Sequence, residues 1–204
     1  GEPWNARAIN DRIGFTAATS QDIWPDHPEK VLGTRRDWVE QHPNTSRALV
    51  AALLDAARWI DASDDNKRET AKILAQRGWL NTKEQYLTGR MLGAYDNGIG
   101  RRWQDPHPIR FFDQGEVSYP WLSDGMWFLT QFRRWGLLKS DPDYLAVAQR
   151  INRIEVWKEA ALAVGGVSAP TQTLRSSKLI DGSIWTGADP AGYARSFNVQ
   201  RLGA

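Results

Sequence analysis

Residues 1–30 read GEPWNARAINDRIGFTAATSQDIWPDHPEK, and the rest of the chain is organised around this stretch. It opens on Gly-Glu-Pro-Trp, continues with an alternating run from Ile13 to Thr19, and closes on the basic residue Lys30. Both faces of the alternating run are small or apolar, which predicts a strand over residues 12–20 that is covered on both sides. Helices on both faces of a parallel sheet give that environment, so the stretch indicates an α/β fold.

The remainder of the chain reads mainly as helices. Apolar residues recur at spacings of three and four along residues 44–61, and an aromatic face runs along residues 121–138. Shorter helices are predicted at 66–78, 82–92, 142–150 and 152–165, and a last turn begins at Asp189-Pro190. Residues 28–33 predict one helical turn, residues 93–119 a long loop, residues 167–177 a linker, and the Asp-Gly pair at 181–182 a small hairpin.

The composition fits one large domain or parts of two, and it restricts the partners. The chain has 204 residues, of which 41% are hydrophobic, and 26 basic residues nearly balance 24 acidic ones. Because the basic and acidic residues nearly balance, the chain has no strongly positive surface as a whole, and we predict no direct nucleic-acid partner. No apolar run approaches the roughly 18 residues that a membrane span needs. The chain begins at Gly1 without an initiator Met, so we expect a truncated or processed piece that has lost any targeting segment.

The residue pattern favours neither an enzyme nor a metal protein. There are no cysteines, which excludes disulfides, thiolate metal sites and thiol nucleophiles. His27, His42 and His107 each lie next to a proline, at spacings unlike any metal-binding motif. There is no G-x-S-x-G nucleophile motif and no dinucleotide-binding glycine pattern. We therefore predict no catalytic residues, no cofactor and no metal site.

Two kinds of residue remain as candidates for binding a small ligand. Trp4 and Trp121 each follow a proline and are the best candidates, among eleven tryptophans, to line a cleft. Lys30 has two interpretations: a solvated lysine on a short helix, or a compact point charge for a small anion. In the second interpretation, backbone N–H groups at Gly1 and at helix N-termini would supply directional donors.

Several segments in order resemble one protein family. GEPWNARA (1–8), IGFTA (13–17), DIW (22–24), DHPEK (26–30), HPNTSRALV (42–50), YPWLSDGMWFLTQ (119–131) and RWG (134–136) resemble the nitrate- and bicarbonate-binding proteins of bacterial ABC transporters, the NrtA/CmpA type, and their cytoplasmic nitrate/nitrite-sensor relatives. The resemblance covers most of the chain.

The resemblance implies an α/β fold of the two-lobed, type II periplasmic-binding-protein kind, helix-rich in this chain. Residues 1–20 would form the end of one lobe and a hinge strand, and residues 21–204 the mainly helical remainder of both lobes, with the N-terminal half of the protein missing. A small oxyanion would be held between the lobes. Nitrate binders of this family contact the anion with a lysine, which Lys30 matches, whereas bicarbonate binders are expected to use a carboxylate and a cation. The ligand-binding residues implied are Lys30, Gly1, Glu2 and Trp4.

The implied function is binding of nitrate or nitrite by the periplasmic substrate-binding component of an ABC-type nitrate transport system, whose partners are the permease and ATPase. The alternative is a cytoplasmic nitrate/nitrite sensor that controls a transcription-antitermination regulator through the same anion site. A sugar-binding module is a weaker alternative, suggested by the tryptophans alone.

Overall fold

The computed structural model describes residues 2–197, and the chain divides into two compact units, each considered by itself. The first unit comprises Gly1–Ile23 and Ala52–Ser118, and the second comprises Trp24–Ala51 and Tyr119–Ala204. Helix α4 (Pro43–Asp61) contributes residues to both units.

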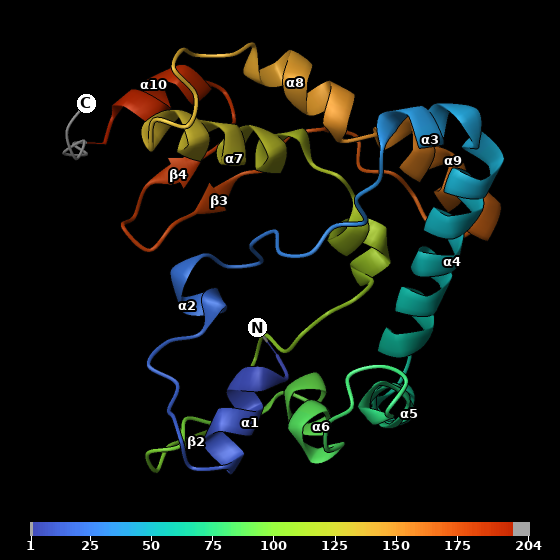
Figure 1. The fold of residues 1–204 in the computed structure, drawn as a ribbon, viewed down its shortest axis with the longest axis vertical. Helices are drawn as coiled ribbons and strands as arrows, with labels where there is room; N and C mark the ends of the chain where they lie inside the picture. Colours follow the sequence, from blue (N-terminus) through green and yellow to red (C-terminus); the bar gives the residue numbers. More distant parts are fainter. Residues whose placement is uncertain (1, 198–204) are drawn as a thin grey trace. The chain divides into compact units, whose positions relative to one another are not determined.

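In the first unit, short helices pack around one small core. Its elements are α1 (Trp4–Asn10), α2 (Ser20–Ile23), the second part of α4, α5 (Asp64–Ala75), α6 (Gln85–Met91), the antiparallel pair β1 (Ala94–Asp96) and β2 (Arg102–Gln104), and the 3₁₀ segment η1 (Asp113–Ser118). Helix α6 packs against both α1 and α5 (Figure 1). Ala71, Leu87 and Met91 form the core, and Ile60 and Phe111 pack against it.

The second unit is built around α7. Its elements are α3 (Arg36–Gln41), the first part of α4, α7 (Leu122–Arg134), α8 (Tyr144–Ile151), α9 (Ile154–Val164), the antiparallel pair β3 (Ser177–Lys178) and β4 (Ile184–Trp185), and α10 (Pro190–Arg195). Helix α7 packs against α8 and α10, as Figure 1 shows. Leu122, Met126, Tyr144, Ala148 and Trp185 form its core, each exposed by 5% or less.

Short polar side chains begin several of these helices. The Oγ of Ser63 accepts a hydrogen bond from the Asn66 amide at 3.1 Å at the start of α5. The carboxylates of Asp143 and Asp189 accept equivalent bonds at the starts of α8 and α10. Each bond satisfies an amide that the first helical turn leaves without a partner, which fixes where the helix begins.

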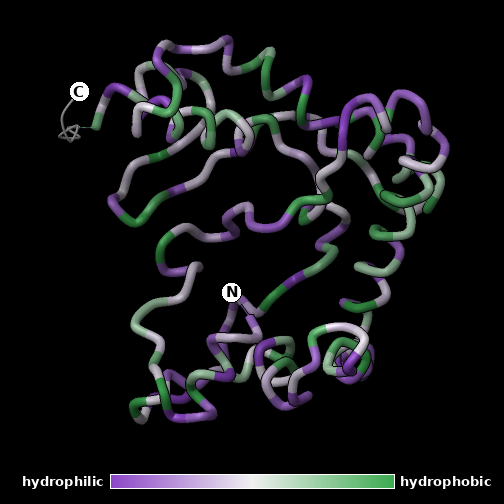
Figure 2. Tube along the Cα trace, viewed as in Figure 1, coloured by the Kyte–Doolittle hydropathy of each residue, from purple (hydrophilic) through white to green (hydrophobic). Residues whose placement is uncertain are grey.

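No helix in the described residues is both long enough and apolar enough to cross a membrane. Figure 2 shows hydrophilic and hydrophobic residues interleaved along α4, which is the 19-residue helix Pro43–Asp61. This interleaving is the pattern of a helix that buries only one face.

The strongest helical patterns are confirmed. The helix predicted over residues 44–61 corresponds to α4, and that over 121–138 corresponds to α7, which ends earlier, at Arg134. The predicted Asp-Gly hairpin forms between β3 and β4, with Gly182 at φ 82°. The last predicted turn is α10.

The strand predicted over residues 12–20 is wrong, whereas the hinge role implied for residues 1–20 remains a prediction. Residues 14–19 are irregular, and Ile13 and Phe15 are 79% and 63% exposed. A strand needs a neighbouring strand, and over residues 2–197 the strands form only the two short hairpins. Instead of a ladder, the Thr16 amide donates to the Asn97 carbonyl at 2.9 Å, and the amides of Arg12 and Ile13 donate to carbonyls of α1 at 3.1 and 2.9 Å.

Two further predictions need correction. Residues 28–33 form no helical turn, and the apolar side chains of Val31 and Leu32 are 86% and 53% exposed, so little packing stabilises a helix here. The loop predicted over residues 93–119 contains the β1–β2 hairpin and η1. The assignment of residue ranges to lobes remains a prediction.

The core residue Tyr144 generates a test at alkaline pH. Burial, followed by the hydrogen bond that its hydroxyl donates to Asp141 at 2.8 Å, raises the pKa of Tyr144 to about 12. An acid with a raised pKa in the folded state stabilises the protein below its unfolded pKa, and this stability is lost as pH rises from about 10 to about 12. Since one pKa unit corresponds to roughly 1.4 kcal/mol, the loss is on the order of 2 kcal/mol. We expect urea unfolding of Tyr144→Phe to show a smaller decline over this interval than the parent chain; parallel declines would contradict the assignment.

Candidate functional site

The segment that carries Lys30 begins with a tight turn. The Trp24-Pro25-Asp26-His27 turn is closed by a hydrogen bond from the His27 amide to the Trp24 carbonyl at 3.2 Å. Asp26 has φ 53°, so a proline is followed by a residue of positive φ, as in a type II turn. A left-handed conformation is uncommon for a residue with a side chain, so its surroundings must maintain it.

Lys30 itself lies in an irregular, solvated segment. Its ammonium lies 3.0 Å from the Glu29 carboxylate, and the two side chains are 77% and 57% exposed. The hydrogen bond from Lys30 lowers the pKa of Glu29. A pair this exposed contributes little to stability, so the ammonium can exchange Glu29 for another anion at small cost.

Trp24 anchors the start of this segment to α7. Its side chain is 7% exposed, and its ring lies 4.6 Å from the ring of Trp127, centroid to centroid. A large buried ring fixes the position of the backbone that carries it.

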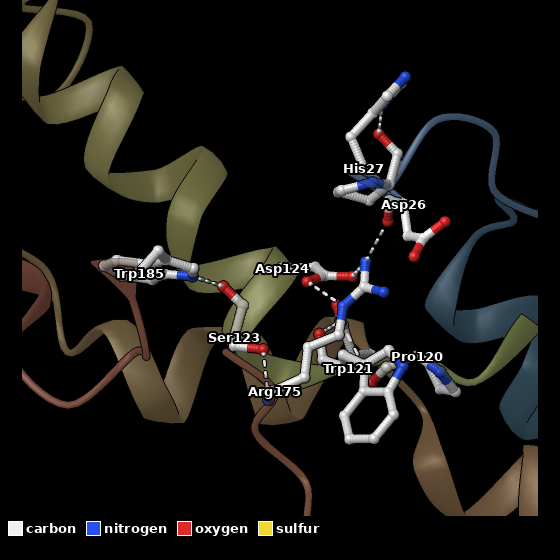
Figure 3. Close-up of polar contacts among 10 residues, drawn as sticks. Asp26, His27, Pro120, Trp121, Ser123, Asp124, Arg175 and Trp185 are labelled. Atoms are coloured by element: carbon white, nitrogen blue, oxygen red, sulfur yellow. Dashed lines mark hydrogen bonds and ion pairs between the residues drawn. The ribbon is translucent and has the colours of Figure 1, made fainter. Parts of the chain in front are cut away.

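Arg175 holds the turn that follows. Its Nη2 donates to the Asp26 carbonyl at 3.1 Å, and the same guanidinium donates to both carboxylate oxygens of Asp124, from Nε at 3.0 Å and from Nη2 at 2.8 Å. Figure 3 shows the guanidinium between these two acceptors. A bidentate pair of this kind constrains both the position and the plane of the guanidinium.

Residues at the start of α7 also hydrogen-bond to the Arg175 backbone. The Arg175 amide donates to the Ser123 Oγ, and the Ser123 carbonyl accepts from the indole N–H of Trp185, both at 3.0 Å (Figure 3). The Leu122 amide donates to the Thr173 carbonyl at 2.9 Å. Since Trp185 belongs to the core of the second unit, hydrogen bonds run from that core to the turn at Asp26.

Burial and pairing act on Asp124 in opposite directions. Burial raises the pKa of the Asp124 carboxyl, and the hydrogen bond and charge of Arg175 lower it, so that the pKa remains above its ordinary value. The side chains of Arg175 and Asp124 are 25% and 13% exposed. Arg175 therefore compensates for the burial of a carboxylate that solvent reaches poorly.

The opening segment belongs to the first unit. Glu2 forms an ion pair with the Arg90 Nε and accepts a hydrogen bond from the Ala6 amide, both at 3.1 Å, and Arg90 is buried against the Tyr95 ring. Both carboxylate oxygens of Glu2 thus hold the start of α1 in place.

The predicted ligand-binding residues that the structure describes are distributed over the two units. Trp4 is 52% exposed on α1, in the same unit as Glu2, whereas Lys30 belongs to the second unit. Gly1 lies outside the described residues. Trp121, the other predicted cleft residue, is 8% exposed and packs on the ring of Tyr119, which is the arrangement of a core residue. The ligand-binding roles of Lys30, Gly1, Glu2 and Trp4 remain predictions.

Sequence reasoning missed Arg175 and Asp124. Arg175 lies in residues 167–177, which read as a linker, and Asp124 read as the start of a helix. Their contacts join positions 51 and 149 residues apart along the chain, so no local pattern marks them. Among the described residues, no group of three or more histidine, aspartate or glutamate side chains is placed to hold a metal ion.

Comparisons with known proteins identify the fold. The structure resembles the crystal structure of the periplasmic nitrate-binding protein NrtA from Synechocystis, with a TM-score of 0.89 and 32% sequence identity over 98% of this chain and 52% of that one. The fold is therefore that of the periplasmic binding proteins, as predicted, and it is rich in helices here.

Sequence comparisons identify the family. Residues 1–75 match the model of the NMT1-like family. The chain is 35% identical to the nitrate/nitrite binding protein NrtA of Nostoc, over 99% of this chain and 46% of that protein. It is 34% identical to the bicarbonate-binding protein CmpA of Synechococcus elongatus, over 98% of this chain and 47% of that protein, and 34% identical to the nitrate import ATP-binding protein NrtC of Synechocystis, over 98% of this chain and 30% of that protein. The chain belongs to the nitrate/bicarbonate solute-binding protein family, and it spans about half the length of the binding proteins that it matches.

The buried pair at the start of α7 makes a prediction about titration. Removing the Arg175 guanidinium takes away the hydrogen bond and the charge that lower the Asp124 pKa and leaves the burial that raises it. We therefore expect Arg175→Met to raise the pKa of Asp124 further, as measured from the pH dependence of its carboxyl ¹³C shift.

The same change has a consequence for stability. A raised carboxyl pKa favours the folded state at low pH and disfavours it as pH rises through that pKa, so Arg175→Met should destabilise the chain more at pH 7 than below the Asp124 pKa. Arg153→Met, which removes an exposed partner of Glu155, is the control. An unchanged Asp124 titration in Arg175→Met would contradict the pairing.

Proposed function

We propose that this chain is part of a protein that binds a small oxyanion, nitrate or nitrite, as the substrate-binding component of an ABC-type nitrate transport system. The observation that carries the proposal is the similarity, over nearly the whole chain, to the nitrate-binding protein of Synechocystis and to the nitrate/nitrite binding protein of Nostoc. The role is binding rather than catalysis, since both of these relatives are named as binding proteins.

The lysine at position 30 supports nitrate over bicarbonate because, by family resemblance, nitrate binders contact the anion with a lysine and bicarbonate binders use a carboxylate and a cation. An exposed ammonium can donate up to three hydrogen bonds and neutralises one negative charge, which suits a monovalent anion. The neighbouring Glu29 pairs with the ammonium at 3.0 Å, and this exposed contact is weak enough to be replaced by another anion.

One lysine cannot supply the whole site, because a small anion loses its hydration shell on binding and needs several donors in return. We propose that Gly1 supplies a backbone N–H donor and Trp4 an aromatic wall. Glu2 would act through its ion pair with Arg90 and the hydrogen bond that it accepts from the Ala6 amide, which hold the start of α1. The remaining donors would come from the part of the fold that corresponds to the rest of the relatives' length.

The partners and location follow from the same similarity. We propose an ABC permease and ATPase as partners and a periplasmic location, because the Synechocystis relative is described as periplasmic. The sensor that controls an antitermination regulator remains an alternative with the same anion site.

One observation favours a second candidate. The match to the nitrate import ATP-binding protein NrtC covers 98% of this chain but only 30% of that protein. A segment of this kind can therefore lie inside an ATP-binding protein, where it would bind the anion on the ATPase polypeptide itself. Sequencing the gene that surrounds this segment separates the two candidates: an adjoining nucleotide-binding domain supports the second, and a binding protein of the relatives' length supports the first.

The anion site is tested by calorimetry on the protein at its relatives' full length, with nitrate, nitrite and bicarbonate as ligands. Lys30→Glu replaces attraction by repulsion, so we expect nitrate affinity to fall by at least about 100-fold. Lys139→Glu, which makes the same charge change at an exposed position in the loop after α7, is the control and should change affinity little. Equal affinity in the parent and in Lys30→Glu would remove Lys30 from the site.

A further inference from the structure

The segment that carries Lys30 has no regular structure of its own to orient it. Residues 27–35 are neither helix nor strand, and Val31, next to Lys30, is 86% exposed. The position of Lys30 therefore depends on the turn that precedes it, Trp24–His27. Asp26 in this turn precedes Lys30 by four residues.

Trp24 and Asp26 attach the turn to other described residues of the second unit. Trp24 packs on Trp127 at 4.6 Å, and the Asp26 carbonyl accepts a hydrogen bond from Arg175 at 3.1 Å. The first attachment fixes where the turn begins. The second acts at Asp26, whose positive φ is a conformation that a residue with a side chain rarely adopts unless other contacts stabilise it.

Arg175 is suited to hold this carbonyl because its guanidinium is already fixed. Its Nε and Nη2 donate to the two oxygens of Asp124 at 3.0 and 2.8 Å, and Asp124 lies in the first turn of α7. Holding the carbonyl therefore requires no further ordering of the arginine side chain. A lysine at this position could not satisfy both carboxylate oxygens and the carbonyl with the same planar geometry.

We propose that Arg175 is a positioning residue for oxyanion binding: through the Asp26 carbonyl it holds the turn that fixes Lys30, and so it sets the affinity without touching the anion. This inference rests on the proposed function. A site that is ordered before binding avoids the entropy of ordering the segment when the anion arrives. Without the Arg175 contact, Lys30 would keep its charge but would occupy the anion-binding position less often.

The variant that tests the proposal must keep the chain folded. Arg175→Met alone would leave Asp124 buried without its partner, so we choose Arg175→Met combined with Asp124→Leu, which replaces the pair by apolar side chains. Arg133→Met is the matched control: the Arg133 side chain is 21% exposed, close to the 25% of Arg175, and its partner Asp141 keeps Arg195. Thermal unfolding of both variants establishes that each is folded.

The first measurement is hydrogen exchange without anion, on the protein at its relatives' full length. The His27 amide, which closes the turn, should exchange at least about tenfold faster in the double variant, and the amides of the β3–β4 hairpin should not change. Arg133→Met should leave the His27 amide unchanged. Unchanged exchange at His27 in the double variant would overturn the proposal.

The second measurement is a double-mutant cycle on nitrate affinity by calorimetry. We expect the double variant to bind nitrate about tenfold more weakly, and the same change to have no further effect when Lys30→Met is already present, because Arg175 acts through Lys30. An equal loss in both backgrounds would show that Arg175 does not act through Lys30 and would overturn the proposal. If the parent protein binds no nitrate, the proposed function fails and the effect on affinity fails with it, while the exchange result still decides whether Arg175 holds the turn.

Discussion

The second unit depends on the ion pair between Arg175 and Asp124. Arg175 joins three segments that are far apart in the sequence: the turn at Asp26, the first turn of α7, and its own irregular segment before β3. A buried ion pair gains little net stability, because the desolvation of both charges offsets their attraction. What it provides is a single arrangement, since any other position of these segments would leave Asp124 buried without a partner. The pair thus acts on the geometry of the unit more than on its free energy of unfolding.

Buried and exposed charges have different roles in this chain. Glu2 with Arg90 and Asp124 with Arg175 are partly or largely buried, and each holds a backbone segment in place. Lys30 is exposed and its partner Glu29 is weakly held, which leaves its charge available to a ligand. This division explains why the residue proposed to contact the anion has no strong contact of its own. We propose that the position of Lys30 is fixed by Arg175 and Asp124, which do not contact the anion.

Part of this fold could be predicted from the sequence, where a local pattern alone determines the structure. The apolar stripe of α4 and the aromatic face of α7 predicted two helices, and Asp-Gly predicted the hairpin at Gly182. The alternation from Ile13 to Thr19 wrongly predicted a strand. A strand requires a partner strand, and the sequence of one segment does not show whether a partner exists. Arg175 could not be found at all, since its partners lie 51 and 149 residues away. Its residue type left Lys30 with two interpretations, a solvated lysine or an anion contact, and the family resemblance favoured the second.

The central claim is that the Lys30 ammonium, held in place from Arg175, contacts the bound anion. The most direct test is the ¹⁵N signal of the Lys30 side chain, assigned by its absence in Lys30→Arg, during a nitrate titration of the protein at its relatives' full length. We expect this signal to shift with the same saturation curve as calorimetric binding, and chloride at equal ionic strength not to reproduce the shift. A Lys30 signal that stays unchanged while nitrate saturates the protein would contradict the account.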